Sequence, residues 1–341
     1  MFNNVKKVMM SKSLLLIVAF GVLFCTAVKA NNTPPASVSS ENLDKTLVYI
    51  VSDFNIPFWK ILGRGIQKSA RTLGYKVDVY SANNSAKREL ELTIKAIQNK
   101  VTGIIISPTT SSAAATILKF AKKANIPVVI ADIGTDGGEY VSYISSDNRS
   151  GAYEIGKILA TQLKQKGWEN SSVGIIAISQ KRSNGRARTA GFMQAMKEAN
   201  IKSIGIKQQA TFTYQESYDY SIELIKQDPN LRAIWIQGSD RYQAVLDAIN
   251  YSGKKDDILL ASFDAEPIFL ELIPKEIIVG AAMQQPFLMG NKSVIVMDSY
   301  LNGRRVVKNF QLPILAISSE NIAEKLPVIN RNVLGIELVK H

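Results

Sequence analysis

Short apolar runs alternate with amphipathic segments along the chain from Thr46 onward. The apolar runs are rich in Ile and Val, and turn residues separate them from segments with helical periodicity. In the first half the pattern predicts strands at 47–51, 77–80, 103–107 and 127–131, and helices at 58–73, 87–98 and 113–124. Such alternation predicts a parallel sheet with helices on both faces, and runs such as GIIIS are typical of strands buried on both sides.

The alternation starts again at residue 151 and produces a second, similar half. There we expect helices at 151–165, 186–199, 214–227 and 241–251, and strands at 173–178, 203–208, 233–237 and 258–262. The segment SSDNRSG, residues 145–151, is the expected first crossover. Three further elements are predicted after the second half: a helix at 266–273, a strand at 277–283 and a helix at 286–301. The second half is complete without all of them, so we expect one of them to pack on the first half. The predicted fold class is α/β, with two doubly wound parallel-sheet lobes.

Residues 1–30 read as an export signal peptide. Lys6, Lys7 and Lys12 precede an apolar run that ends in Val-Lys-Ala. That run is about eleven residues long, shorter than the roughly twenty of a membrane span, although an uncleaved anchor helix is the alternative. Cys25 follows a phenylalanine instead of the small residue of a lipoprotein signal, so no lipid anchor is predicted. Residues 31–45 read as a flexible polar leader, and the mature chain is expected in the periplasm.

The charge and the scarcity of Cys and His exclude several functions. The net charge is +12, and cleavage of a signal with four lysines and no acid would leave +8. Lys and Arg are scattered without interleaved aromatics, so no nucleic-acid partner is predicted. Cys25 lies in the signal, and the only histidine is the terminal His341. We therefore predict no metal, no cofactor and no Cys or His nucleophile.

Polar and aromatic side chains follow the carboxyl ends of the predicted strands, where open parallel sheets form their binding crevice. They are Ser52, Asp53, Phe58, Trp59 and Asp132 in the first half, and Phe212, Gly238, Ser239, Asp240, Asp264 and Gln284 in the second. Arg186 and Arg188 begin a helix after the turn SQKRSNG. Carboxylates and an arginine can bind hydroxyl groups, and aromatic rings pack on apolar C–H faces. The set suits a small polyhydroxylated ligand.

The chain resembles the periplasmic sugar-binding proteins of the ribose and galactose type, which share their fold with LacI-type repressor cores. The resemblance covers nearly all of residues 46–320. It is carried by NIPFW, ANIPVVIAD, YISSDNRSGA, RARTAGF, the DPN turn before AIWIQ, SFDAEP, MQQP and ISSENI, in this order. It implies a type I periplasmic binding protein fold, with lobes joined by a multi-strand hinge. We expect an N-terminal lobe of 46–147 plus 285–312 and a C-terminal lobe of 148–284 plus 313–341.

Carried over residue by residue, the resemblance implies seven ligand contacts: Phe58, Trp59, Asp132, Arg188, Phe212, Asp264 and Gln284. Each has an alternative. Phe58 and Trp59 could be core residues at a helix start, and the two aspartates could serve as structural caps or form hinge hydrogen bonds. Phe212 could end an ordinary strand, and Gln284 could be a hinge amide. Arg186 is expected to be solvated, and Asp147 and Asn148 to serve the crossover between the lobes.

Three positions depart from the ribose-binding pattern, because Ile56, Ile133 and Gly238 stand where polar residues are expected. Missing partners cost about 1–3 kcal/mol each, so tight binding of ribose itself is not expected. Asp53, Ser239, Asp240 and Glu266 are candidates to supply replacements.

The resemblance implies a monomeric solute-binding protein that captures a sugar-like ligand and delivers it to an ABC permease. The alternative partner is a membrane sensor kinase. A glycosidase would use two carboxylates across a sugar cleft, as Asp132 and Asp264 could provide. Both are expected to be ionised beside Arg188, with nothing that raises one pKa, so the chain is not predicted to be an enzyme.

Overall fold

The structure is a computed structural model that describes residues 45–336, all of which belong to one compact unit. The expected signal peptide, nearly all of the expected leader and His341 lie outside the described residues. In the part of the chain that the structure describes, no helix is long and apolar enough to cross a membrane.

The strands form two sheets of six strands each. The first sheet has the order β11 (Asn309–Leu312), β5 (Ser142–Ser146), β4 (Val128–Ala131), β3 (Gly103–Ser107), β1 (Thr46–Val51) and β2 (Lys76–Ser81), with parallel neighbours throughout. The second has the order β12 (Leu315–Ser318), β10 (Gly280–Met283), β9 (Leu259–Phe263), β8 (Leu231–Ile236), β6 (Ser172–Ala177) and β7 (Lys202–Gln208), with only β12 antiparallel to its neighbour. These sheets confirm the predicted α/β fold with two doubly wound lobes.

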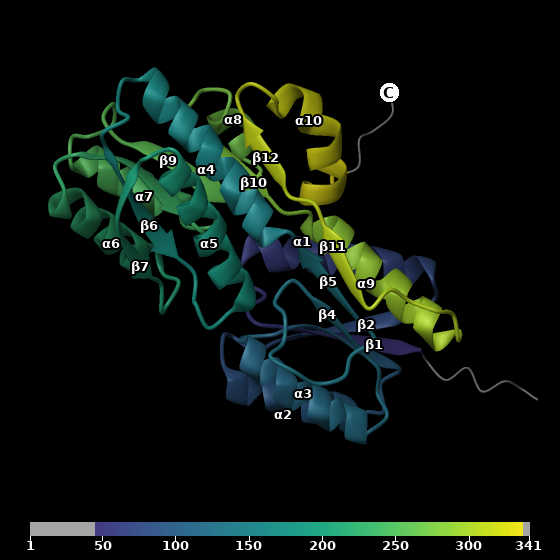
Figure 1. The fold of residues 1–341 in the computed structure, drawn as a ribbon. Helices are drawn as coiled ribbons and strands as arrows, with labels where there is room; N and C mark the ends of the chain where they lie inside the picture. The colour runs from purple at the N-terminus through teal and green to yellow at the C-terminus, as the bar shows by residue number, and fades with distance from the viewer. Residues whose placement is uncertain (1–44, 337–341) are drawn as a thin grey trace, which may run out of the picture. The chain divides into compact units, whose positions relative to one another are not determined.

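Both faces of the first sheet are covered by helices, because its strands are apolar on both sides. Along β1, Leu47 and Tyr49 pack toward one face and Val48 and Ile50 toward the other. The first face carries α1 (Pro57–Thr72) and α9 (Pro286–Leu301), and the second α2 (Ala86–Gln98) and α3 (Ser111–Lys123) (Figure 1). This packing explains the uninterrupted Ile and Val content of the central strands.

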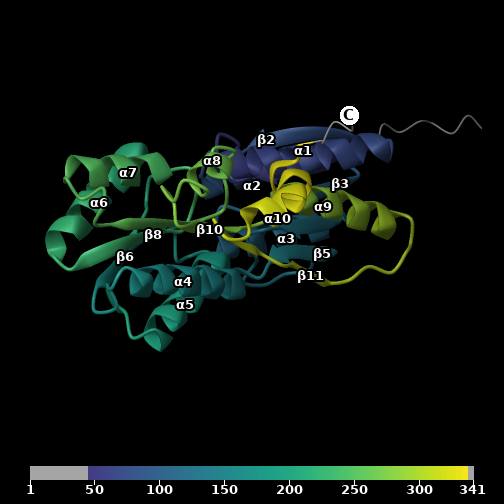
Figure 2. The ribbon, with the colours of Figure 1, turned by 90° about the horizontal axis from the view of Figure 1, so that it is seen from above.

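The second sheet is sandwiched in the same way (Figure 2). One face packs on α4 (Asn148–Gln165) and α5 (Ser183–Glu198), and the other on α6 (Tyr214–Gln227), α7 (Tyr242–Tyr251) and the short α8 (Phe269–Leu272). Trp235 of β8 stacks on Phe192 of α5 with ring centroids 4.0 Å apart, and both side chains are fully buried. This aromatic pair anchors α5, the helix that carries Arg188.

Three segments of the described chain pass between the sheets: β5 to α4, β10 to α9, and β11 to β12. The second of these returns α9 to the first sheet, where it packs on α1. After β12, α10 (Ile322–Val328) and a π-helix, η1 (Ile329–Leu334), pack on β12 and α9 respectively. The exact lobe boundaries stay a prediction, although the sheet membership of the strands agrees with them.

Several predicted element bounds are wrong. The helix expected at 186–199 begins at Ser183, the helix expected at 266–273 spans only Phe269–Leu272, and the strand expected at 277–283 begins at Gly280. β5, β11 and β12 were not predicted. The sequence NFQL of β11 alternates polar and apolar residues, but four residues are too few to predict a strand by themselves, and the segment becomes a strand by pairing with the edge of β5.

Candidate functional site

A cavity lies where the carboxyl ends of both sheets face each other, as expected for open α/β sheets. Its walls include all seven side chains singled out from the sequence: Phe58, Trp59, Asp132, Arg188, Phe212, Asp264 and Gln284. Further residues line it as well: Ile56, Ile178, Arg182, Asn184, Gln209, Gln237, Gly238 and Asp240. The tertiary structure thus gathers the seven residues in one place, and their role as ligand contacts stays a prediction.

The two aspartates hold equivalent positions in the two lobes. Asp132 directly follows β4 and Asp264 directly follows β9, and both have left-handed backbone, with φ of 66° and 67°. Each backbone N–H donates to the neighbouring strand, Asp132 to the carbonyl of Ile144 and Asp264 to that of Ala282, both at 2.9 Å. Aspartate tolerates this conformation better than most residues, which explains why the chain can turn both carboxylates out of the strand direction.

Phe212 has a strained backbone conformation. Its φ is 57°, and a bulky residue in this left-handed region carries strain of about 1–3 kcal/mol. Two neighbours hold it there. Its N–H donates to Glu216 Oε2 at 2.8 Å, and its carbonyl accepts from Arg241 Nε at 2.7 Å. Thr213 caps the start of α6, because its hydroxyl accepts from the Glu216 N–H at 3.2 Å. The strained loop is therefore fixed from both sides.

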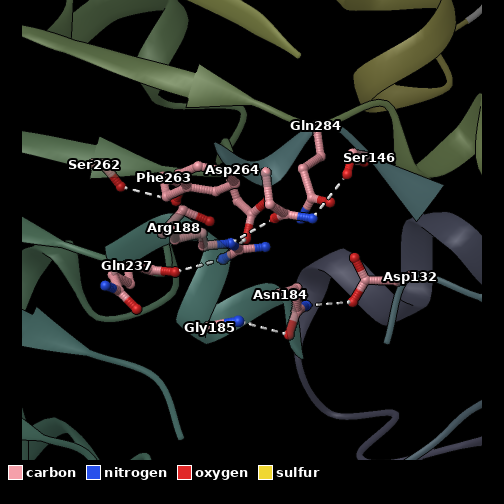
Figure 3. Close-up of polar contacts among 12 residues, drawn as sticks. Asp132, Ser146, Asn184, Gly185, Arg188, Gln237, Ser262, Phe263, Asp264 and Gln284 are labelled. Atoms are coloured by element: carbon pink, nitrogen blue, oxygen red, sulfur yellow. Dashed lines mark hydrogen bonds and ion pairs between the residues drawn. The ribbon is translucent and has the colours of Figure 1, made fainter. Parts of the chain in front are cut away.

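Arg188 stands at the centre of a buried network in the second lobe (Figure 3). Its guanidinium donates to the Gln237 carbonyl at 2.6 Å and to Asn148 Oδ1 at 2.8 Å, and lies 3.4 Å from Asp264 Oδ2. Asp264 Oδ1 accepts from Gln284 Nε2 at 2.7 Å. Burial raises the pKa of Asp264, and the charge of Arg188 opposes that shift. The network presents a fixed arginine and carboxylate to the cavity.

Asp132 faces this network from the first lobe, and its Oδ2 accepts from Asn184 Nδ2 at 3.2 Å. Burial raises the pKa of Asp132 to about 6, the positive charge of Arg188 opposes the rise, and the negative charge of Asp264 adds to it. The expectation that nothing raises the pKa of either aspartate is therefore wrong, since sequence position does not show how completely a carboxylate is desolvated. At neutral pH a carboxyl group with this pKa is still mostly ionised.

Among residues 45–336, three buried side-chain oxygens of the cavity wall have neither a hydrogen-bond partner nor an ion-pair partner: Asp132 Oδ1, Gln237 Oε1 and Gln284 Oε1. A fourth, Asp240 Oδ2, lacks a hydrogen bond but pairs with Arg241. The three unpaired oxygens are all acceptors. A buried acceptor without a donor costs about 1–3 kcal/mol, so this arrangement favours a ligand that supplies several donors. A molecule with several hydroxyl groups has that property.

Phe58 and Trp59 are both core residues and cavity residues. They lie in the first turn of α1, their rings meet edge to face with centroids 4.8 Å apart, and they are 9% and 4% exposed. Both pack into the core beneath the first sheet, and both line the cavity. The sequence left open whether these rings belong to the core or to the site. Both can hold at once, because a ring can pack one face in the core and present an edge or its other face to the cavity.

The start of α5 joins the two lobes. Arg182 Nε donates to the carbonyl of Thr109 at 3.1 Å, and the Ser183 N–H donates to Ser111 Oγ at 3.2 Å. Together with the bond from Asn184 to Asp132, they form three polar contacts across the cavity region. Arg182 and Asn184 were not predicted to be site residues, because the sequence KRSN is typical of a solvent-exposed turn. The available signal was their position near strand ends: Arg182 and Asn184 lie in the loop after the strand predicted at 173–178, Gln209 directly follows the strand predicted at 203–208, and Gln237 ends the strand predicted at 233–237.

Several other residues considered from the sequence have different surroundings. Arg186 is exposed and donates to the carbonyl of Gln180 at 2.9 Å. Asp147 caps α4, and Asn148 orients Arg188. Of the four candidate replacements, Asp240 lines the cavity, whereas Asp53 bonds to Asn55 and Asn84, and Ser239 donates to Glu266 at 2.7 Å. Ile133 is fully buried in the core of the first lobe.

The chain belongs to the periplasmic binding protein family. The family model described as "Periplasmic binding protein domain" matches residues 47–305. Together with the paired six-stranded sheets, this shows a type I periplasmic binding protein fold and indicates an exported, periplasmic protein. The matched region ends inside the described chain, beyond every residue of the cavity wall.

Relatives and solved structures agree with this assignment. The chain is 31% identical over 276 residues to a ribose import binding protein of Escherichia coli K12, covering 80% of this chain and 90% of the relative. It is 28% identical over 307 residues to the ribose import binding protein of Bacillus subtilis 168, covering 89% and 98%. A carbohydrate transporter solute binding protein of Agrobacterium radiobacter, solved with D-arabinose, has a TM-score of 0.79 at 23% identity, covering 86% of this chain and 99% of that one. That structural likeness supports the fold.

Proposed function

We propose that this protein captures a small polyhydroxylated ligand, a monosaccharide or a close analogue, in the cavity between its lobes and delivers it to an ABC importer. The observation that carries the proposal is the set of three unpaired buried acceptors beside Arg188 and the two aromatic rings. Hydroxyl groups would satisfy the acceptors, and the rings would cover an apolar C–H face. Import binding proteins for ribose among the relatives support the same ligand class.

Binding would be coupled to closure of the lobes about the three crossing segments. The contacts of Arg182, Ser183 and Asn184 with the first lobe would form in the closed state and break on opening. A ligand that touches both lobes shifts this equilibrium by its preference for the closed state alone. The two aspartates, one from each lobe, are the residues we propose to bridge the lobes through the ligand.

We propose delivery to an ABC permease by a monomer, with a cleaved signal peptide, in preference to presentation to a sensor kinase. The import relatives favour transport. We also propose binding without catalysis. The import binding proteins among the relatives favour this. Of the two carboxylates that a glycosidase would need, that of Asp264 has both oxygens held, by Arg188 and by Gln284.

A thermal-shift screen of residues 31–341 tests the proposed ligand class. With pentoses, hexoses and polyols as probes, we expect at least one to stabilise the protein, by about 2.7 kcal/mol at 100 times its Kd, because it binds only the folded state. Amino acids and citrate serve as controls that should cause no shift. Stabilisation by none of the polyhydroxylated probes would contradict the proposal, as would release of product from a glycoside at a measurable rate.

Ligand affinity is expected to fall as the pH falls through about 6, the pKa of the Asp132 carboxyl, which burial raises. Ligand hydroxyls donate to the ionised carboxylate, so the bound form favours the deprotonated state. Protonation of the free protein therefore competes with binding, and Kd should be about tenfold higher at pH 5 than at pH 7. Isothermal titration calorimetry at both pH values measures the ratio.

The matched control is Asp132→Asn, which keeps the shape of the side chain and removes the charge. Asp132 is surrounded by Arg182, Arg188 and Asp264, and the pKa of Asp264 is also raised, through its burial. The variant should bind more weakly at pH 7 and lose most of the pH dependence. An undiminished tenfold ratio in the variant would assign the titration to another group.

A further inference from the structure

Gly238 lies in the cavity wall, after Gln237 in the loop that follows β8, at a place where the protein itself does not require glycine. Its φ lies outside the left-handed region. A Cβ built there would have as its nearest described atoms Asp240 Oδ1 at 3.4 Å and Ile178 Cγ2 at 4.0 Å, which is ordinary van der Waals contact. The missing side chain therefore leaves space that belongs to the cavity.

At other buried glycines, close packing does require the absence of a side chain. A Cβ at Gly191 would lie 2.0 Å from the carbonyl oxygen of Arg149, and one at Gly290 would lie 2.1 Å from that of Leu62. Both allow two helices to approach closely, α5 on α4 and α9 on α1. No such approach exists at Gly238 within the described chain, so close packing does not account for it.

The space beside Gly238 is bordered by two different kinds of atom. Ile178 offers a methyl group, and Asp240 offers a carboxylate oxygen. The other oxygen of Asp240 lies 2.9 Å from Arg241 Nη1, which keeps the carboxylate oriented. A substituent that fits this place has a carbon to pack on the methyl group and an O–H to donate to the carboxylate.

We propose that Gly238 determines ligand specificity, and that the space beside it accepts a hydroxymethyl group on the sugar ring. The methylene packs on Ile178, and the hydroxyl donates to Asp240 Oδ1. This inference rests on the proposed function, and it narrows the ligand to ring sugars with an exocyclic CH2OH, such as hexopyranoses.

Calorimetric titration of sugar pairs that differ only in this group tests the inference. The pairs are D-galactose with L-arabinose, D-glucose with D-xylose, and D-allose with D-ribose, each hexose matched to the pentose of the same ring configuration. In whichever pair binds, the hexose should bind at least about 30-fold more tightly, because one lost carbon and one unpaired acceptor cost about 1–3 kcal/mol each. The 6-deoxy analogue of that hexose should fall between the two.

Gly238→Ala fills the space and supplies the second measurement. Affinity for the hexose should fall at least about tenfold, while affinity for the pentose changes less than about twofold. Gly137→Ala is the control, because a Cβ there meets no described atom within 4 Å and Gly137 lies outside the cavity wall. Urea unfolding of both variants should match the wild type.

The possible results distinguish failure of this inference from failure of the proposed function. Equal affinity for pentose and hexose, or an equal loss of both in Gly238→Ala, overturns the inference and leaves the proposed function standing. Failure of every sugar to bind overturns the proposed function and the inference with it.

Discussion

Replacing Arg188 with alanine is expected to lower the free energy of unfolding by about 3–5 kcal/mol, because it removes one partner of a buried ion pair and leaves the other charge uncompensated. The Arg188 side chain is 3% exposed and that of Asp264 12%. Without the guanidinium, the Asp264 carboxylate keeps only the hydrogen bond from Gln284, and the Gln237 carbonyl and Asn148 Oδ1 lose a donor. Urea unfolding at pH 7 measures the loss, and the same variant should bind no sugar detectably.

Arg186→Ala is the matched control for this experiment. Arg186 lies two positions earlier in the same helix, is exposed, and makes one hydrogen bond to a backbone carbonyl, so its removal should change stability by no more than about 0.5 kcal/mol. The double variant Arg188→Ala with Asp264→Asn should lose less than the sum of the single variants, because the unpaired charge is gone. Strict additivity, or a loss below about 1 kcal/mol in Arg188→Ala, would mean that the pair is not coupled as the geometry indicates.

Trp59→Ala is expected to affect both stability and binding. Removing a buried indole costs about 3–5 kcal/mol of unfolding free energy through lost packing and the cavity it leaves. If the ring also covers a face of the sugar, Kd should rise about 30-fold or more, the effect of a hot-spot tryptophan worth about 2 kcal/mol. Calorimetry below the unfolding transition of the variant measures Kd, and chemical unfolding measures stability.

Trp235→Ala separates the two effects. Trp235 is fully buried and stacked on Phe192, and it does not belong to the cavity wall. It should lose a similar amount of stability while the folded protein keeps its Kd. Trp59→Phe, which preserves a ring, should recover much of the binding. If Trp59→Ala and Trp235→Ala weaken binding equally, the role of Trp59 is confined to the core.

The central strands were predictable because their physics is local to the sequence. A run such as GIIIS can be placed only where both faces are buried, and Gly74 ends a helix with a φ of 78° that glycine adopts without strain. β5 and β11 were not predictable in this way. These two strands pair with each other although they lie about 165 positions apart in the chain. Neither SYISS nor NFQL alone indicates that the other segment is its partner.

The residues of the site likewise fall into those that the sequence predicted and those that it did not. Asp132, Asp264 and Gln284 were found because each stands immediately after an apolar strand, and parallel sheets bring such positions to one edge. Arg182 and Asn184 were not found, since their contacts with Thr109 and Asp132 come from the opposite lobe. The packing of the two lobes determines which side of a turn faces the other lobe, and the sequence near the turn does not show it.

The sequence by itself determined the two-lobed α/β fold and the edge at which a ligand site can form, because apolar periodicity and strand direction depend on neighbouring residues in the chain. Only the tertiary structure decided which polar atoms are left without partners, how far burial raises the pKa of Asp132, and that the place beside Gly238 is open. Desolvation and unfilled space depend on what approaches from distant parts of the chain.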